Sequence, residues 1–99
     1  MKTVFEPGYY MTVELRLKDL STLEVTKKAL AELASKSLAE PGCSIFLGQY
    51  DVKTPTRIIF WERFDDEAAF NSHLAQAHTK AFTALGLTEF VHAHVTSIT

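Results

Sequence analysis

The side chains best suited to acid–base chemistry are histidines in the second half of the chain. All four histidines lie between positions 73 and 94. His73 and His78 fall in a segment expected to be helical, at opposite borders of its apolar stripe, where a side chain can reach a cleft between helix and sheet. Because imidazole titrates near neutral pH, either residue could move protons. The alternative is that both are boundary residues bonded to water or backbone.

Glu62 is the most informative carboxylate. It lies in a predicted strand on the same face as Phe60 and Phe64. A carboxylate among large apolar side chains is costly unless it is paired or functional, because burial disfavours its charged form. We interpret Glu62 as a pocket carboxylate that pairs with a histidine of the covering helix. The alternative is a strand-end glutamate that reaches solvent or an arginine such as Arg63.

Other reactive residues give weaker signals. His92 and His94 point to one face of the last predicted strand, but no third ligand is fixed beside them, so a polar lining is favoured over a metal site. Cys43 has no base placed to activate it. As the single cysteine, it excludes an intrachain disulfide and fits a reducing cytoplasm. The sequence has no glycine-rich phosphate loop, G-x-S-x-G or C-x-x-C motif.

Six elements must position these residues. Apolar periodicity predicts strands at residues 9–18, 44–52, 57–64 and 89–98. One predicted helix is capped by Ser21 and ends at Pro41, and another begins at Asp65 or Asp66 and ends at Gly86. The order β-α-β-β-α-β predicts an α+β, ferredoxin-like fold with a split β-α-β arrangement. We expect residues 1–8 to form a leader and residues 9–99 a single domain.

The two middle strands carry apolar residues on both faces, as in Ile58-Ile59-Phe60-Trp61 and Ile45-Phe46-Leu47. Two helices can cover only one face of a four-stranded sheet. A second copy of the chain is the simplest cover for the other face. The sequence therefore predicts a homodimer.

Composition narrows the class of protein. The chain has 99 residues, 46% of them hydrophobic and 22% charged, which is typical of one globular domain. A net charge of −2 with scattered basic residues argues against nucleic acid as a partner. No apolar run is long enough for a signal peptide or a membrane span. We expect a cytoplasmic protein.

Three motifs together resemble the antibiotic biosynthesis monooxygenase (ABM) family, and within it the small quinol monooxygenase-like proteins. The first motif is Glu40-Pro41-Gly42-Cys43, and the second is Pro55-Thr56-Arg57 leading into Phe60-Trp61-Glu62-Arg63-Phe64. The third is Phe70-Asn71-Ser72-His73 followed by His78-Thr79-Lys80-Ala81-Phe82. Each piece is weak alone, but the joint order and spacing are fairly specific. The resemblance extends from about Tyr9 to Ile98.

The resemblance implies a ferredoxin-like homodimer, a dimeric α+β barrel, and a pocket bordered by Glu62, His73 and His78. It implies oxidation of a small aromatic, quinol-like substrate by dioxygen without a metal or other cofactor. His73 would act as the base, Glu62 would orient it, and His78 would hold the substrate oxygen or help move the proton. The substrate-binding candidates are Phe60, Trp61, Phe64 and Phe82.

Departures from the family pattern leave other readings open. Thr83 stands where haem-degrading relatives carry a histidine, which disfavours haem. Ala77 replaces a proline common in relatives, which predicts a more continuous second helix, although a pause near Gln76 is also expected. One alternative function is an isomerase or lyase acting on a small, phosphorylated carbonyl compound. Another is a non-catalytic, ligand-binding dimer.

Overall fold

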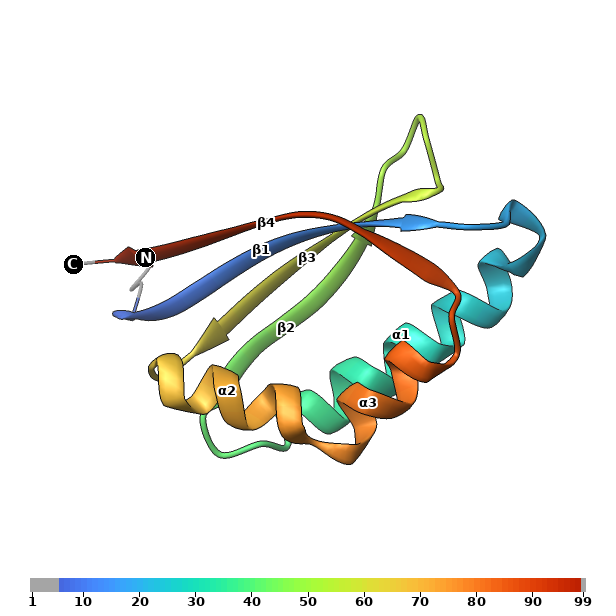
Figure 1. The fold of residues 1–99 in the computed structure, drawn as a ribbon. Helices are drawn as coiled ribbons and strands as arrows, with labels where there is room; N and C mark the ends of the chain where they lie inside the picture. The colour runs from blue at the N-terminus through green and yellow to red at the C-terminus, as the bar shows by residue number, and fades with distance from the viewer. Residues whose placement is uncertain (1–5, 99) are drawn as a thin grey trace, which may run out of the picture.

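The computed structural model describes residues 6–98, which form one antiparallel sheet covered by helices on one face (Figure 1). The sheet has four strands in the order β2-β3-β1-β4. The strands are β1 (Gly8–Leu17), β2 (Cys43–Tyr50), β3 (Arg57–Phe64) and β4 (Thr88–Ile98). The helices are the short 3₁₀ helix η1 (Leu20–Thr22), α1 (Leu23–Leu38), α2 (Glu67–Ala75) and α3 (Ala77–Ala84). The predicted ferredoxin-like α+β class is confirmed. The predicted leader lies mostly outside the described residues.

The core lies between the sheet and the helices because side chains alternate along each strand. In the register of β1 with β3, Val13 is opposite Phe60 and Met11 is opposite Glu62. These inward positions meet the buried face of α1, which carries Leu30 and Leu33. The buried apolar residues are Met11, Leu17, Leu30, Leu33, Cys43, Phe46, Ile58, Phe60 and Phe64.

The opposite face of the sheet, here called the outer face, is not covered by any helix within residues 6–98 (Figure 1). Leu47 is opposite Trp61 in the register of β2 with β3, and both side chains are about half exposed. Ile45 and Val91 are also exposed. The prediction that the middle strands are apolar on both faces is therefore confirmed.

Two local predictions are wrong. Asp19, not Ser21, caps the first helical segment, because its Oδ1 accepts hydrogen bonds from the backbone N–H and the hydroxyl of Ser21. In β4, a register shift between Glu14 and Leu15 of β1 turns Phe90 toward the helices. The alternation along residues 89–98 predicts Phe90 on the same face as His92 and His94. A bulge inserts one extra residue, and it therefore reverses the sides of all residues beyond it.

The second predicted helix is two helices. Gln76, with φ −68° and ψ 147°, is extended and separates α2 from α3. The Gln76 N–H donates to the backbone carbonyl of His73 at 3.1 Å, and the Thr79 hydroxyl donates to the same carbonyl at 2.7 Å, so two hydrogen bonds hold the end of α2. The expected pause near Gln76 is confirmed, and the more continuous helix inferred from Ala77 is wrong.

No helix within residues 6–98 is both long and apolar enough to cross a membrane.

Gly42 allows the turn before β2 to pack closely against α2. A Cβ at position 42 would lie 2.5 Å from the Cβ of Ala69. We expect Gly42→Ala to lower the free energy of unfolding by about 1–3 kcal/mol through overpacking. Urea denaturation of Gly42→Ala, Ala69→Gly and the double variant measures this. The double variant should be about as stable as Ala69→Gly alone; additive losses would contradict the predicted steric contact.

Candidate active site

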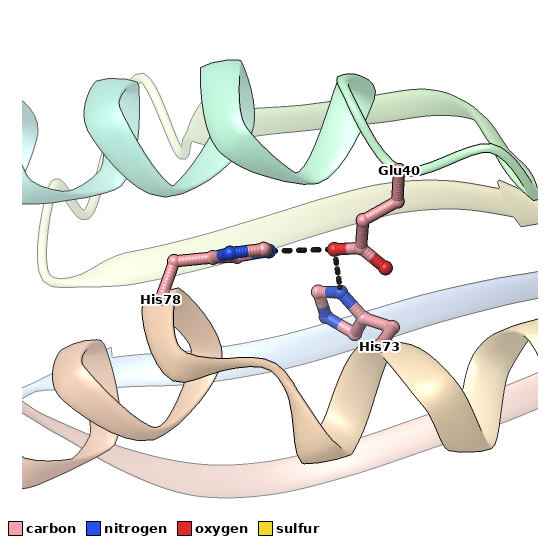
Figure 2. Close-up of side chains that lie close together, drawn as sticks. All are labelled: Glu40, His73 and His78. Atoms are coloured by element: carbon pink, nitrogen blue, oxygen red, sulfur yellow. Dashed lines mark hydrogen bonds and ion pairs between the residues drawn. The ribbon is translucent and has the colours of Figure 1, made fainter.

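The carboxylate of Glu40 joins two histidines from two different helices (Figure 2). Its Oε2 lies 2.9 Å from Nδ1 of His73 and 2.6 Å from Nε2 of His78. Glu40 follows the end of α1, His73 belongs to α2, and His78 belongs to α3. A carboxylate oxygen can only accept here, so both ring nitrogens donate their protons to it.

The break at Gln76 makes this convergence geometrically feasible. Residues five apart on a continuous α-helix point about 140° away from each other, because each residue turns the helix by about 100°. His73 and His78 would then face different neighbours. The extended backbone at Gln76 redirects α3, and both rings reach the same oxygen, with their centroids 6.1 Å apart.

The three side chains are well shielded from solvent. Their exposed fractions are 5% for His73, 9% for Glu40 and 13% for His78. The His73 ring packs against Phe46 and Phe64, with centroid distances of 5.3 and 5.2 Å. The surrounding apolar groups hold the ring in place, and in such surroundings a charge-assisted hydrogen bond is stronger than in water.

His73 also faces a cavity of about 330 Å³ between the sheet and the helices. A neutral imidazole that donates from Nδ1 carries a lone pair on Nε2. Nε2 points away from Glu40 (Figure 2) and has no hydrogen-bond partner within residues 6–98. The cavity is lined by His73 and Glu62 together with Met11, Val13, Leu15, Leu33, Phe46, Phe60, Phe70, Leu74, Phe82, Thr83, Thr88, Phe90 and Ala93.

Glu62 is the second polar group of this cavity, and it is 7% exposed. No hydrogen bond or ion pair joins its carboxyl group to any other part of residues 6–98. Burial, and secondarily the charge of Glu40, raises the pKa of Glu62 from 4.5 to about 7. A large share of this carboxyl group is therefore protonated at neutral pH and can donate a hydrogen bond into the cavity.

The structure separates the residues that sequence reasoning grouped together. The expected pairing of Glu62 with a histidine is wrong, because Glu40 takes that place. His78 does not line the cavity that contains Glu62; it borders a separate groove between α1 and α3. Glu40 lies in a turn, where the sequence has no periodic pattern from which its burial could be predicted.

Only two of the four aromatic residues predicted to bind substrate line the cavity. Phe60 and Phe82 line the cavity. Phe64 is fully buried in the core and supports the His73 ring without bordering the cavity. Trp61 lies on the outer face, because it neighbours the inward Phe60 along the strand and side chains alternate.

The remaining candidates lie away from the cavity. His92 and His94 are exposed on the outer face with ring centroids 4.3 Å apart. Cys43 is buried, and burial together with the charges of Glu40 and Glu62 raises its thiol pKa to about 11. Its thiol is therefore protonated at neutral pH and is a poor nucleophile.

The chain folds into a ferredoxin-like α+β domain with a cavity between its sheet and helices. The family profile described as antibiotic biosynthesis monooxygenase matches residues 9–85. The chain belongs to this family, which includes monooxygenases.

Solved structures confirm the fold. A structure titled "protein YJCS" is similar with a TM-score of 0.84 and 23% identity over 92% of this chain and 98% of that one. A conserved protein of unknown function from Bacteroides thetaiotaomicron has a TM-score of 0.83 and 18% identity, over 95% and 100% of the two chains. A structure titled antibiotic biosynthesis monooxygenase has a TM-score of 0.75 and 21% identity, over 91% and 96%. No curated protein matches the sequence.

The raised pKa of Glu62 predicts a pH-dependent stability. The folded state binds the Glu62 proton more tightly than the unfolded chain, so this contribution is complete below pH 4.5 and is lost as the pH rises to about 7. We expect the free energy of unfolding to fall by about 3 kcal/mol over this interval, relative to Glu62→Gln.

Urea denaturation between pH 4.5 and 8 measures this difference. The exposed Glu89→Gln serves as a matched control and should run parallel to the wild-type protein. Parallel curves for the wild-type protein and Glu62→Gln would show that Glu62 titrates normally.

Proposed function

We propose that this protein is a cofactor-independent monooxygenase that oxidises a small aromatic, quinol-like substrate with dioxygen. The observation that carries the proposal is the fixed His73 ring, which is bonded to Glu40 through Nδ1 and borders an apolar cavity on its other side. Membership of the family supports the reaction class. The cavity volume of about 330 Å³ suits a ligand with one or two aromatic rings.

The reaction draws all its electrons from the substrate. A quinol and one dioxygen give a hydroxyquinone and one water, so one oxygen atom enters the ring and the other leaves as water. Removal of the phenolic proton gives an electron-rich phenolate, which passes an electron to dioxygen. The resulting superoxide and semiquinone combine to form a C–O bond. The O–O bond then breaks as the ring proton leaves, and the released hydroxide is protonated to water.

Each polar residue has a distinct part in this scheme. His73 accepts the phenolic proton at Nε2 and returns it to the departing oxygen. Glu40 acts as a positioning residue, because its bond to Nδ1 sets the His73 tautomer and stabilises the cation formed. Protonated Glu62 donates a hydrogen bond to the second substrate oxygen. His78 acts through Glu40, to which it is hydrogen-bonded from α3.

The aromatic side chains provide the binding surface. Phe60 and Phe82 line the cavity and can stack against a planar substrate. Phe64 lies behind His73 and keeps its ring in place. Trp61 belongs to the outer face, where it serves assembly and not substrate binding.

The same acid–base groups also suit an isomerase or lyase acting on a small carbonyl compound. Glu62 as a proton donor and His73 as a proton acceptor border one cavity, which is the arrangement that enolisation needs. Oxygen consumption separates the two functions, because isomerisation or elimination uses none. Thermal stabilisation by aromatic compounds without their conversion would instead indicate a binding protein.

Replacement of His73 tests the proposed base. A thermal-shift screen of quinols and phenols, with oxygen uptake measured for every hit, should identify a substrate. We expect His73→Gln to lower turnover by about 10²- to 10⁴-fold, because the amide cannot accept the proton. His92→Gln changes a histidine on the outer face and should retain full activity. Wild-type turnover in His73→Gln would exclude His73 as the base.

We further propose that a second copy of the chain covers the outer face, and that the protein acts in the cytoplasm, as its single cysteine suggests. The outer face carries the half-exposed pair Leu47 and Trp61, flanked by Ile45 and Val91. An apolar surface of this kind is typical of an interface. A two-fold axis would bring the same rows of both copies together and bury them.

Sedimentation tests the homodimer. The wild-type chain of 11.1 kDa should sediment as a species of about twice that mass at micromolar concentration. Trp61→Glu places a charge in the interface and should give monomers. Val25→Glu alters a similarly exposed apolar residue on α1, and it should leave the dimer intact. A stable wild-type monomer would contradict the proposed dimer.

A further inference from the structure

We infer that Glu40, His73 and His78 form a binding site for a divalent transition-metal ion, with Zn²⁺ as the best-fitting ion. Each residue offers one ligand atom, and these three atoms lie within 4.8 Å of one another. They come from three separate segments: the turn after α1, helix α2 and helix α3. The proposal goes beyond the proposed oxidation and does not depend on it.

The distances between the ligand atoms are close to those around a metal ion. In tetrahedral geometry, bonds of about 2.0–2.2 Å to zinc place neighbouring ligand atoms about 3.3–3.5 Å apart. Oε2 of Glu40 already lies 2.9 Å from Nδ1 of His73 and 2.6 Å from Nε2 of His78. An ion entering this site would need to separate these atoms by less than about 1 Å. It would replace the two protons that the imidazoles now donate to the carboxylate.

The types of ligand favour zinc and its neighbours over calcium or magnesium. Two imidazoles and one carboxylate are typical of Zn²⁺ sites that keep an open position. Calcium and magnesium prefer sets of oxygen ligands, which this cluster lacks. Copper and nickel also accept imidazole, so the proposed site should bind them as well.

The residues around the proposed metal site hold its ligands in place and leave a path by which an ion can enter. Thr79 donates to the carbonyl of His73 and lies 3.5 Å from its Nδ1, which fixes the approach of α3 to α2. On the other side, His78 borders a groove of about 230 Å³ between α1 and α3 that also contains Glu32 and Lys36. This groove gives an ion a path from solvent and leaves room for water at the open position.

A second pair of histidines in the chain differs from this cluster and provides a control. The rings of His92 and His94 lie side by side on one face of β4, but both residues are exposed. Within residues 6–98, Glu40, His73 and His78 are the group of three metal-ligating residues whose donor atoms converge. Removal of the outer-face histidines therefore controls for loose binding by surface imidazoles.

Metal binding would change the state of His73, and this consequence rests on the proposed function. An ion on Nδ1 leaves the proton of a neutral imidazole on Nε2, so the ring would donate into the cavity and could no longer accept a proton there. The metal-free protein is then the form that carries out the proposed oxidation.

Calorimetric titration of chelator-treated protein with ZnCl₂, in the absence of substrate, tests the site. We expect one Zn²⁺ per chain, and at least tenfold weaker binding in Glu40→Gln and His78→Gln. The double variant His92→Gln/His94→Gln should bind like the wild-type protein. The absence of saturable binding would overturn the proposal, as would a loss of binding in the double variant with retention in His78→Gln.

Cobalt provides a second measurement that needs no variant to fold. Co²⁺ added to the wild-type protein should give the strong visible absorption of a four- or five-coordinate ion, and Zn²⁺ should displace it. A weak, octahedral spectrum like that of aqueous Co²⁺ would overturn the proposal. Because neither measurement uses a substrate, failure of the oxidation would not affect this result, and failure of metal binding would leave the proposed oxidation standing.

Discussion

The contact of Glu40 with two histidines is the interaction on which the site depends. It connects the end of α1 with α2 and α3, and it is almost entirely shielded from solvent. A buried donor that loses its acceptor costs about 1–3 kcal/mol. Glu40 therefore satisfies two such donors, and at the same time it sets the orientation of the His73 ring toward the cavity. Stability and the proposed function therefore depend on the same carboxylate.

The two glutamates near His73, Glu40 and Glu62, differ in protonation state because their surroundings differ. Glu40 accepts hydrogen bonds from both imidazoles, whereas Glu62 has no such partner within residues 6–98 and is buried among apolar side chains. Burial and the charge of Glu40 both favour the protonated form of Glu62. The paired carboxylate can then stabilise a cation while the other donates a proton. Surroundings that give two neighbouring carboxyl groups different protonation states in this way are typical of acid–base sites.

Sequence patterns predict those parts of the fold that repeat with a regular period. The alternation along residues 57–64 placed Glu62 with Phe60 on the inner face, and the same pattern revealed the apolar outer face. Glu40 could not be found in this way, because a turn has no period from which burial can be read. The bulge opposite Glu14 also escaped prediction, since it depends on the pairing of β1 with β4 and not on either sequence alone.

The break at Gln76 shows why the site required the tertiary structure. Neither proline nor glycine lies at the break, and a continuous helix would have been compatible with the local sequence. Ending α2 there removes the usual helical partner of the His73 carbonyl, which accepts hydrogen bonds from the Gln76 N–H and the Thr79 hydroxyl instead. The two histidines then reach Glu40, whose hydrogen bonds favour the broken form over the continuous one. The break and the carboxylate contact thus stabilise each other, so neither can be derived from its own segment of sequence.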